Sequence, residues 1–76
     1  MYKLVVNVND SIFTFIGKDR DYFLSKVIEW EEFQGDVTGN ASKFLKVHGF
    51  FDRADRGEAV GSFRMDVILG IHVEDY

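Results

Sequence analysis

The chain contains no cysteine and no proline, and it has no long uninterrupted hydrophobic run. Without cysteine, neither a disulfide framework nor a thiolate metal site can stabilise it. Its apolar runs are far shorter than the ~20 residues that cross a bilayer, which argues against a membrane protein. Its first residues alternate as a strand does and lack the plan of a secretory signal peptide. We therefore expect a cytoplasmic protein with no membrane association.

Basic side chains are also scarce. There are 9 Lys and Arg residues against 13 Asp and Glu residues, which gives a net charge of −4 at pH 7. This balance argues against a nonspecific DNA or RNA binder, because such proteins need a basic surface. It allows a protein partner whose surface is basic.

Hydrophobic and aromatic residues are plentiful, at 46% and 16% of 76 residues. Such a content is typical of a folded chain rather than a disordered one. The length accommodates one domain, residues 1–76. Because a core of this size leaves little stability to spare, self-association would help, and we expect a homodimer.

The clearest periodicity lies near the C-terminal end. Every odd position from 63 to 73 is apolar, and a period of two indicates a β-strand with one buried face. Within this strand, Leu69 would face the core and Ile68 would face away.

Two further alternating segments, 2–8 and 11–17, are joined by an Asn-Asp pair at positions 9 and 10. These two residue types favour a two-residue type I′ turn. The turn would fix the register of the hairpin, with Val6 opposite Phe13 on the core face.

The segment 19–33 has the pattern of an amphipathic helix. Phe23, Val27 and Trp30 fall at positions i, i+4 and i+7, which lie on one helix face. Asp19 precedes this pattern and is a candidate N-cap.

Residues 43–51 alternate again and predict a third strand, followed by a charged loop over 52–61. The order ββαββ predicts an α+β fold in which one helix covers one face of a four-stranded mixed sheet. The third strand carries Lys43 and Lys46, as edge strands often do. This favours strand order 2-1-4-3, with the first and fourth strands parallel and joined by a right-handed helical crossover.

This element order and the first strand, Tyr2-Lys3-Leu4-Val5, resemble the β-grasp of small immunoglobulin-binding bacterial domains. The resemblance covers one strand and the order of the elements, and it implies a β-grasp-like sheet. No binding residue is carried over from that family, because no later segment matches and a fold does not determine a function.

The sheet face opposite the helix is the first candidate site. Such a face is expected to be mostly polar where it meets solvent, yet counting by twos places six apolar side chains on it. These are Val5, Ile12, Ile16, Phe44, Phe50 and Ile68. Contiguous apolar patches mark contacts with a partner, although Val and Ile are also simply good strand formers.

The second candidate is the acidic end of the helix, formed by Glu29, Glu31 and Glu32. Negative charge at a helix C-terminus opposes the helix macrodipole. A sequence that accepts this cost presents acid to a basic protein surface. A solvated helix face with Lys26 nearby is the alternative.

The histidines are the third candidate. The expected second hairpin places His48 opposite Asp66, with His72 on the same face, but a metal site needs three or four convergent ligands. Ordinary cross-strand pairing accounts for this arrangement. The chain has no HExxH, CxxC, Gly-rich phosphate loop or nucleophile elbow. We therefore expect no enzyme, and no catalytic residue, metal or cofactor.

The sequence favours a small acidic non-enzymatic protein–protein interaction module that acts as an inhibitor, adaptor or regulator. Proteins of this kind are typical of phages and mobile elements, and their acidic side chains can mimic the phosphates of a nucleic acid. The alternative is a single-stranded nucleic-acid-binding protein that stacks bases on Phe44 and Phe50 beside Lys46 on the outer sheet face.

Overall fold

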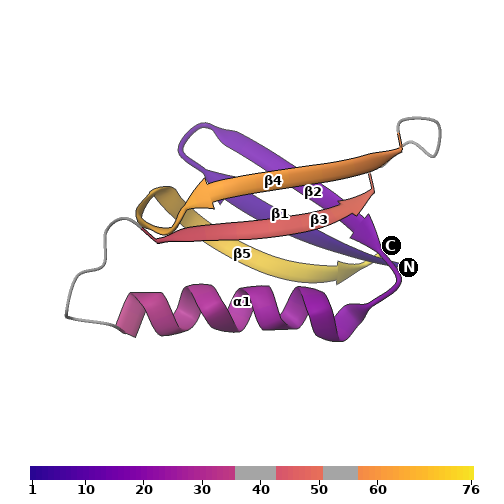
Figure 1. Ribbon diagram of the computed structural model, residues 1–76, viewed down its shortest axis with the longest axis horizontal. Helices are drawn as coiled ribbons and strands as arrows, with labels where there is room; N and C mark the ends of the chain where they lie inside the picture. The colour runs from indigo at the N-terminus through magenta and orange to yellow at the C-terminus, as the bar shows by residue number, and fades with distance from the viewer. Residues whose placement is uncertain (36–42, 51–56) are drawn as a thin grey trace.

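The computed structural model describes residues 1–35, 43–50 and 57–76 of the chain. These residues form one α-helix and five strands that belong to a single sheet (Figure 1). In chain order the elements are β1 (Tyr2–Val8), β2 (Ser11–Gly17), α1 (Arg20–Gly35), β3 (Phe44–Phe50), β4 (Glu58–Arg64) and β5 (Ile68–Asp75).

The strand order is β4-β3-β2-β1-β5, and every neighbouring pair is antiparallel. The predicted α+β class is confirmed, but the four-stranded mixed sheet of order 2-1-4-3 is wrong. The β-grasp-like arrangement is wrong as well, because β1 pairs in antiparallel fashion with the last strand. The third strand, predicted at an edge, lies inside the sheet.

The predicted strand over 63–73 is in fact two strands. A 3₁₀ turn over Met65–Val67 separates β4 from β5. The backbone N–H of Met65 donates to the carbonyl of Lys43 at 2.9 Å, which ties this turn to the start of β3. The turn divides the predicted strand into β4, which pairs with β3, and β5, which pairs with β1. The predicted loop over 52–61 is also too long, since β4 begins at Glu58. Residues 52–56 of the predicted loop lie outside the described part of the chain.

The start of β5 contains a register shift that exchanges its two faces. Asn7 lies opposite Gly70, but the next residue, Val8, lies opposite Ile68. Leu69 is therefore an extra residue in a β-bulge. As a result Ile68 is 3% exposed and lies in the core, whereas Leu69 is 66% exposed. Both assignments are the reverse of the prediction.

The hairpin of β1 and β2 has the predicted register, with Val6 opposite Phe13. Its turn differs in type, because Asn9 is the only described non-glycine residue with a positive φ, at 51°. A type I′ turn needs positive φ at both central residues. The strand pairing thus follows from the alternation and the two-residue length rather than from that turn type.

The helix begins as predicted. The Oδ1 atom of Asp19 accepts the backbone N–H of Tyr22 at 3.0 Å, which is the N-cap interaction. Phe23 is fully buried, and Val27 and Trp30 pack partly buried against the core. The helix continues to Gly35, two residues beyond the predicted end.

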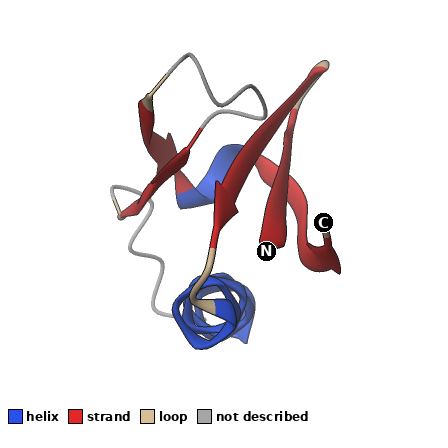
Figure 2. Ribbon diagram, turned by 90° about the vertical axis from the view of Figure 1, so that its right-hand side faces the viewer, coloured by secondary structure: helices blue, strands red, loops and turns tan. Residues whose placement is uncertain are grey.

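The core lies between α1 and two groups of strands. Figure 2, which looks along the helix, shows the strands in two groups above it, with β1 and β5 in the group next to the chain ends. Leu4 and Val6 from one group and Leu45 and Val47 from the other are almost fully buried. Together with Phe23 of α1 they belong to one apolar cluster.

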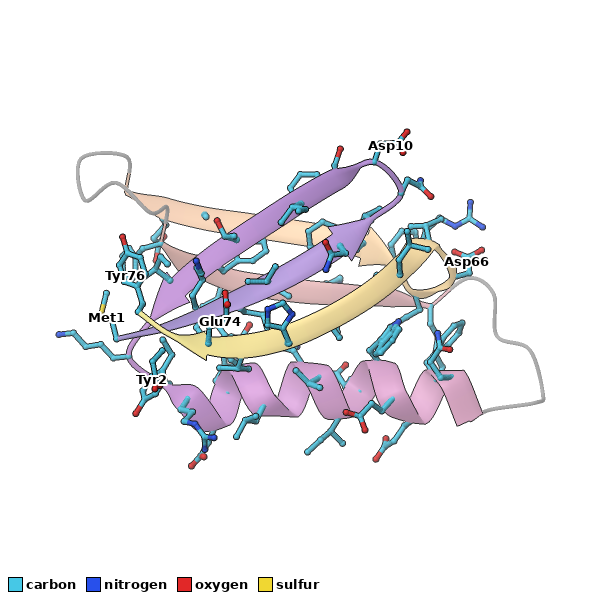
Figure 3. The ribbon with its side chains drawn as sticks, turned by 180° about the vertical axis from the view of Figure 1, so that it is seen from behind. Met1, Tyr2, Asp10, Asp66, Glu74 and Tyr76 are labelled. Carbon is cyan, nitrogen blue, oxygen red and sulfur yellow. The ribbon has the colours of Figure 1, made fainter. Side chains whose placement is uncertain are left out.

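The two chain ends lie side by side. Tyr2 pairs with Asp75, and the backbone N–H of Tyr76 donates to the carbonyl of Met1 at 3.1 Å. Figure 3 shows Met1 and Tyr76 at one end of the molecule, with Asp10 of the first hairpin turn and Asp66 of the 3₁₀ turn at the other end.

Candidate functional site

The sheet opens between β2 and β3. These strands pair at one position, Ile16 opposite Phe50, whereas β3 and β4 pair along their whole length. Beyond that position β2 diverges from β3, which produces the two groups of strands in Figure 2. The N-terminal half of β2 therefore has no strand partner on the side away from β1 within the described residues.

A groove of about 720 Å³ lies at this opening, and we call it the β2–β4 groove. Its lining comes from residues 12–15 of β2 and residues 59–64 of β4, together with Val8, Phe44 and Val67. Most of these side chains are apolar.

Aromatic rings form the floor of the β2–β4 groove. The ring centroid of Phe63 lies 5.2 Å from that of Phe13 and 6.0 Å from that of Phe15. Phe15 and Phe63 are buried, but Phe13 is 43% exposed because no strand covers it. Gly61 lies against this cluster, and a Cβ atom there would stand 2.6 Å from Cζ of Phe15. The groove thus exposes the outermost ring of a packed cluster.

The rim of the groove on one side is the edge of the sheet. The backbone N–H of His48 donates to the Tyr22 hydroxyl at 3.1 Å, so it does not point toward β4. The pairs that exchange hydrogen bonds between β3 and β4 are therefore Leu45 with Phe63 and the pairs two residues along. It follows that the backbone groups of alternate β4 residues point outward from the sheet edge. These residues are Glu58, Val60, Ser62 and Arg64.

The two edge strands of the sheet, β5 and β4, differ in how far they are protected from pairing with another chain. Helix α1 packs along β5, and the bulge at Leu69 interrupts that strand (Figure 1). Such features keep an edge from pairing with another chain. β4 has a regular register, and its sequence contains no proline, no lysine and no bulge. Its Val60 side chain is 79% exposed.

The six side chains expected on one outer face differ in their exposure, and one of them lies in the core. Ile68 is in the core because of the bulge, Val5 is buried on β1 between β2 and β5, and Ile16 is buried where β2 meets β3. Ile12, Phe44 and Phe50 are exposed.

Two of the exposed three belong to one site. Ile12 and Phe44 line the β2–β4 groove. Phe50 lies instead in a separate hollow of about 280 Å³, beside Tyr22 and His48. The sequence therefore identified two of the residues that line the groove.

The acidic helix end is exposed, and Glu29, Glu31 and Glu32 all reach solvent. Glu29 pairs with Lys26 at 3.1 Å, and the last helical turn contains no basic residue. Glu29 and Glu32 line a hollow of about 490 Å³ together with Lys43. Phe44 borders this hollow and the β2–β4 groove, so the acidic end adjoins the apolar site.

The histidines have partners other than those expected. His48 lies opposite Val60 rather than Asp66, and its Nδ1 is 2.9 Å from the Tyr22 hydroxyl. Asp66 binds Arg64 at 2.6 Å instead. His72 lies 3.7 Å from Glu74. Among residues 1–35, 43–50 and 57–76, no three His, Asp or Glu side chains are grouped so as to hold a metal ion.

Sequence reasoning missed Phe13 and Val60 as exposed apolar residues, and it missed β4 as an edge. Phe13 was placed in the core because the hairpin register put it on the core face. The alternation of Ala59, Gly61 and Phe63 with the mostly polar residues between them is a signal for β4, but the charged residues before it mask that signal.

Comparisons with protein-family models, with curated proteins and with solved structures gave no significant match to this chain. In the part of the chain that the structure describes, no helix has the length and apolar content needed to cross a bilayer. The function is therefore argued from the residues of the groove and its surroundings.

Proposed function

We propose that this protein is a small non-enzymatic protein-binding module that acts as an inhibitor, adaptor or regulator by contacting a partner protein. The observation that carries the proposal is the β2–β4 groove, an open apolar surface with an aromatic floor and a free strand edge as its rim. Exposed apolar patches of this kind mark protein contacts.

The rim favours a protein as the occupant. A polypeptide strand can pair its backbone with the outward groups of β4 and place alternate side chains on the aromatic floor. Few side-chain polar groups line the groove, chiefly those of Thr14, Ser62 and Arg64. A polar metabolite would find little to recognise there, because small-molecule sites fix their ligands with well-placed polar groups.

The acidic helix end supports a partner with a basic surface. Glu29 and Glu32 line a hollow that Phe44 shares with the groove, so one partner can contact both regions. Where that partner is a nucleic-acid-binding protein, these carboxylates would occupy the place of phosphates. Complementary charge of this sort raises association rates and selects among partners.

Photo-crosslinking in an extract of the native host tests the proposal. A benzophenone side chain replaces Phe13 in the groove or, as a matched control, Ile28, which is 54% exposed on α1. We expect a crosslinked partner from position 13 and none from position 28, and the unmodified protein should compete the product away. Equal crosslinking from both positions, or none from either, would contradict the proposal.

A second candidate function is single-stranded nucleic-acid binding. Phe44, Lys46 and Phe50 are exposed on one face of β3, and Arg64 lies opposite Phe44. Aromatic rings beside cationic groups stack bases and bind the backbone. Fluorescence anisotropy with a labelled single-stranded oligonucleotide at low and high salt tests this. Tight binding that weakens with salt and is lost in Phe44→Ser would favour this function over protein binding.

A further inference from the structure

We propose that β4 of one molecule pairs edge to edge with β4 of a second copy, antiparallel and centred on Gly61. The partner of the groove is then a second copy of this chain. This inference rests on the proposed function, because the β2–β4 groove is the surface that the pairing would cover.

The backbone of β4 has outward-pointing groups that can form such a pairing. The N–H and C=O groups of Glu58, Val60, Ser62 and Arg64 point away from β3 and form the outer edge of the sheet. The strand is regular and contains no proline, lysine or bulge that would block edge pairing. The other sheet edge, β5, is bulged and lies along α1. Pairing through β4 therefore closes as a dimer and does not continue into a fibre.

Charge complementarity selects the register. Glu58 and Arg64 lie three residues on either side of Gly61. In the antiparallel pair centred on Gly61, Glu58 of each copy therefore stands opposite Arg64 of the other, at both ends of the contact. Parallel pairing would instead set like charges opposite each other, which is unfavourable.

In this register, the backbone groups that form hydrogen bonds between the two copies are the ones that point outward from β4. Glu58 with Arg64 and Val60 with Ser62 are the pairs that exchange hydrogen bonds, and each occurs twice, which gives about eight bonds. Gly61 meets Gly61 of the second copy at the centre, where no side chain hinders the approach. Arg64 already binds Asp66 at 2.6 Å, but its side chain is 55% exposed. A guanidinium has five N–H donors and can bind a second carboxylate.

The pairing also covers apolar surface. A two-fold axis normal to the sheet leaves the inner faces of both copies on the same side. The β2–β4 grooves then open toward each other beneath a continuous β3-β4-β4-β3 sheet. Phe13, the exposed ring of the groove floor, comes to face the second molecule. Burial of these two patches adds a hydrophobic contribution to the hydrogen bonds.

A charge-swap experiment on the full chain tests the register by sedimentation equilibrium. We expect the wild type to dimerise reversibly, and Glu58→Arg and Arg64→Glu each to weaken the dimer about tenfold or more. Mixed in equal amounts, the two variants should form a heterodimer, because every facing pair is then opposite in charge. The controls Asp75→Arg and Lys18→Glu make the same charge changes at exposed sites away from β4 and should leave dimerisation unchanged.

A backbone variant keeps the inference testable if Arg64→Glu fails to fold. The N–H of Ser62 points outward, so Ser62→Pro removes an edge donor and leaves the β3–β4 hydrogen bonds in place. Circular dichroism should be unchanged and the dimer lost. A wild type that is monomeric at about 1 mM, or an Ser62→Pro dimer of undiminished affinity, would overturn the inference. A monomeric wild type that still crosslinks another protein from position 13 would leave the proposed function standing.

Discussion

At the scale of single residues, Gly61 and Phe15 set the shape of the groove. Gly61 has no side chain, so the ring of Phe15 packs directly against the β4 backbone, and a Cβ atom there would approach within 2.6 Å of it. This close contact holds the floor of the groove in place. Phe13 lies two residues before Phe15 on the same face of β2. It has no such cover, and its side chain reaches solvent.

Ile68 and Leu69 show what counting by twos cannot detect. The alternation of apolar residues runs through this segment without a break, so the bulge is invisible in the sequence. The bulge depends on the pairing of β5 with β1, which is a contact between residues about sixty positions apart in the chain. The sequence therefore predicts the wrong member of this adjacent pair as the buried residue.

The first prediction follows from that exchange of faces. Ile68→Ala should lower the free energy of unfolding by about 2–5 kcal/mol, because it leaves a cavity in the core. Leu69→Ala should change it by less than about 0.5 kcal/mol, because that side chain is mostly in solvent. Urea denaturation followed by circular dichroism measures both. Equal losses for the two variants would mean that the bulge is misplaced.

At the scale of elements, the β1–β2 hairpin and α1 were predictable because their signals are local. A two-residue turn sets the hairpin register, and an Asp N-cap with apolar residues at helical spacing marks the helix. β4 was missed in part because its pairing with β3 spans a connection of residues 51–57. The groove depends on that hairpin, and so the site was predictable only at Ile12 and Phe44.

Helix α1 has acidic residues at both ends. Replacing their carboxylates with neutral amides should change the free energy of unfolding in opposite directions at the two ends. Asp21 lies in the first turn, where negative charge suits the macrodipole, whereas Glu31 and Glu32 lie near the C-terminal end. Glu29 is left in place because it pairs with Lys26.

The second prediction uses this difference. The double variant Glu31→Gln, Glu32→Gln should raise the free energy of unfolding by about 0.3–1 kcal/mol per charge, and Asp21→Asn should lower it by a similar amount. Both effects should shrink in high salt, since exposed charges are screened. Thermal and urea unfolding at two salt concentrations would reveal them. A loss of stability in the double variant would show that these carboxylates have a structural role.

At the scale of the whole molecule, the 3₁₀ turn at Met65–Val67 decides the topology. It brings β5 beside β1, so that β1 lies between two antiparallel neighbours and its Leu4 and Val6 are fully buried. A turn inside an unbroken apolar alternation has no proline or glycine to announce it. The strand order was therefore beyond the reach of the sequence, whereas the α+β class followed from the order of its local elements.

The pairing of β5 with β1 places the two chain ends together, and this leads to the last prediction. Tyr2 pairs with Asp75, and the N–H of Tyr76 donates to the carbonyl of Met1 at 3.1 Å (Figure 3). Joining the ends through a short glycine linker should therefore leave the fold unstrained. It should also restrict the unfolded chain, which loses conformational entropy when it is closed into a ring.

We expect the ring to be more stable than the open chain by about 2–4 kcal/mol, the range found for comparable covalent closures. For a chain of this length that corresponds to a rise in melting temperature of roughly 4–8 °C per kcal/mol. The control is a linear protein with the same linker residues appended to Tyr76, so that composition is matched. Urea unfolding of both forms gives the difference directly. A ring that is no more stable than its linear control would mean that the first and last strands are not held side by side.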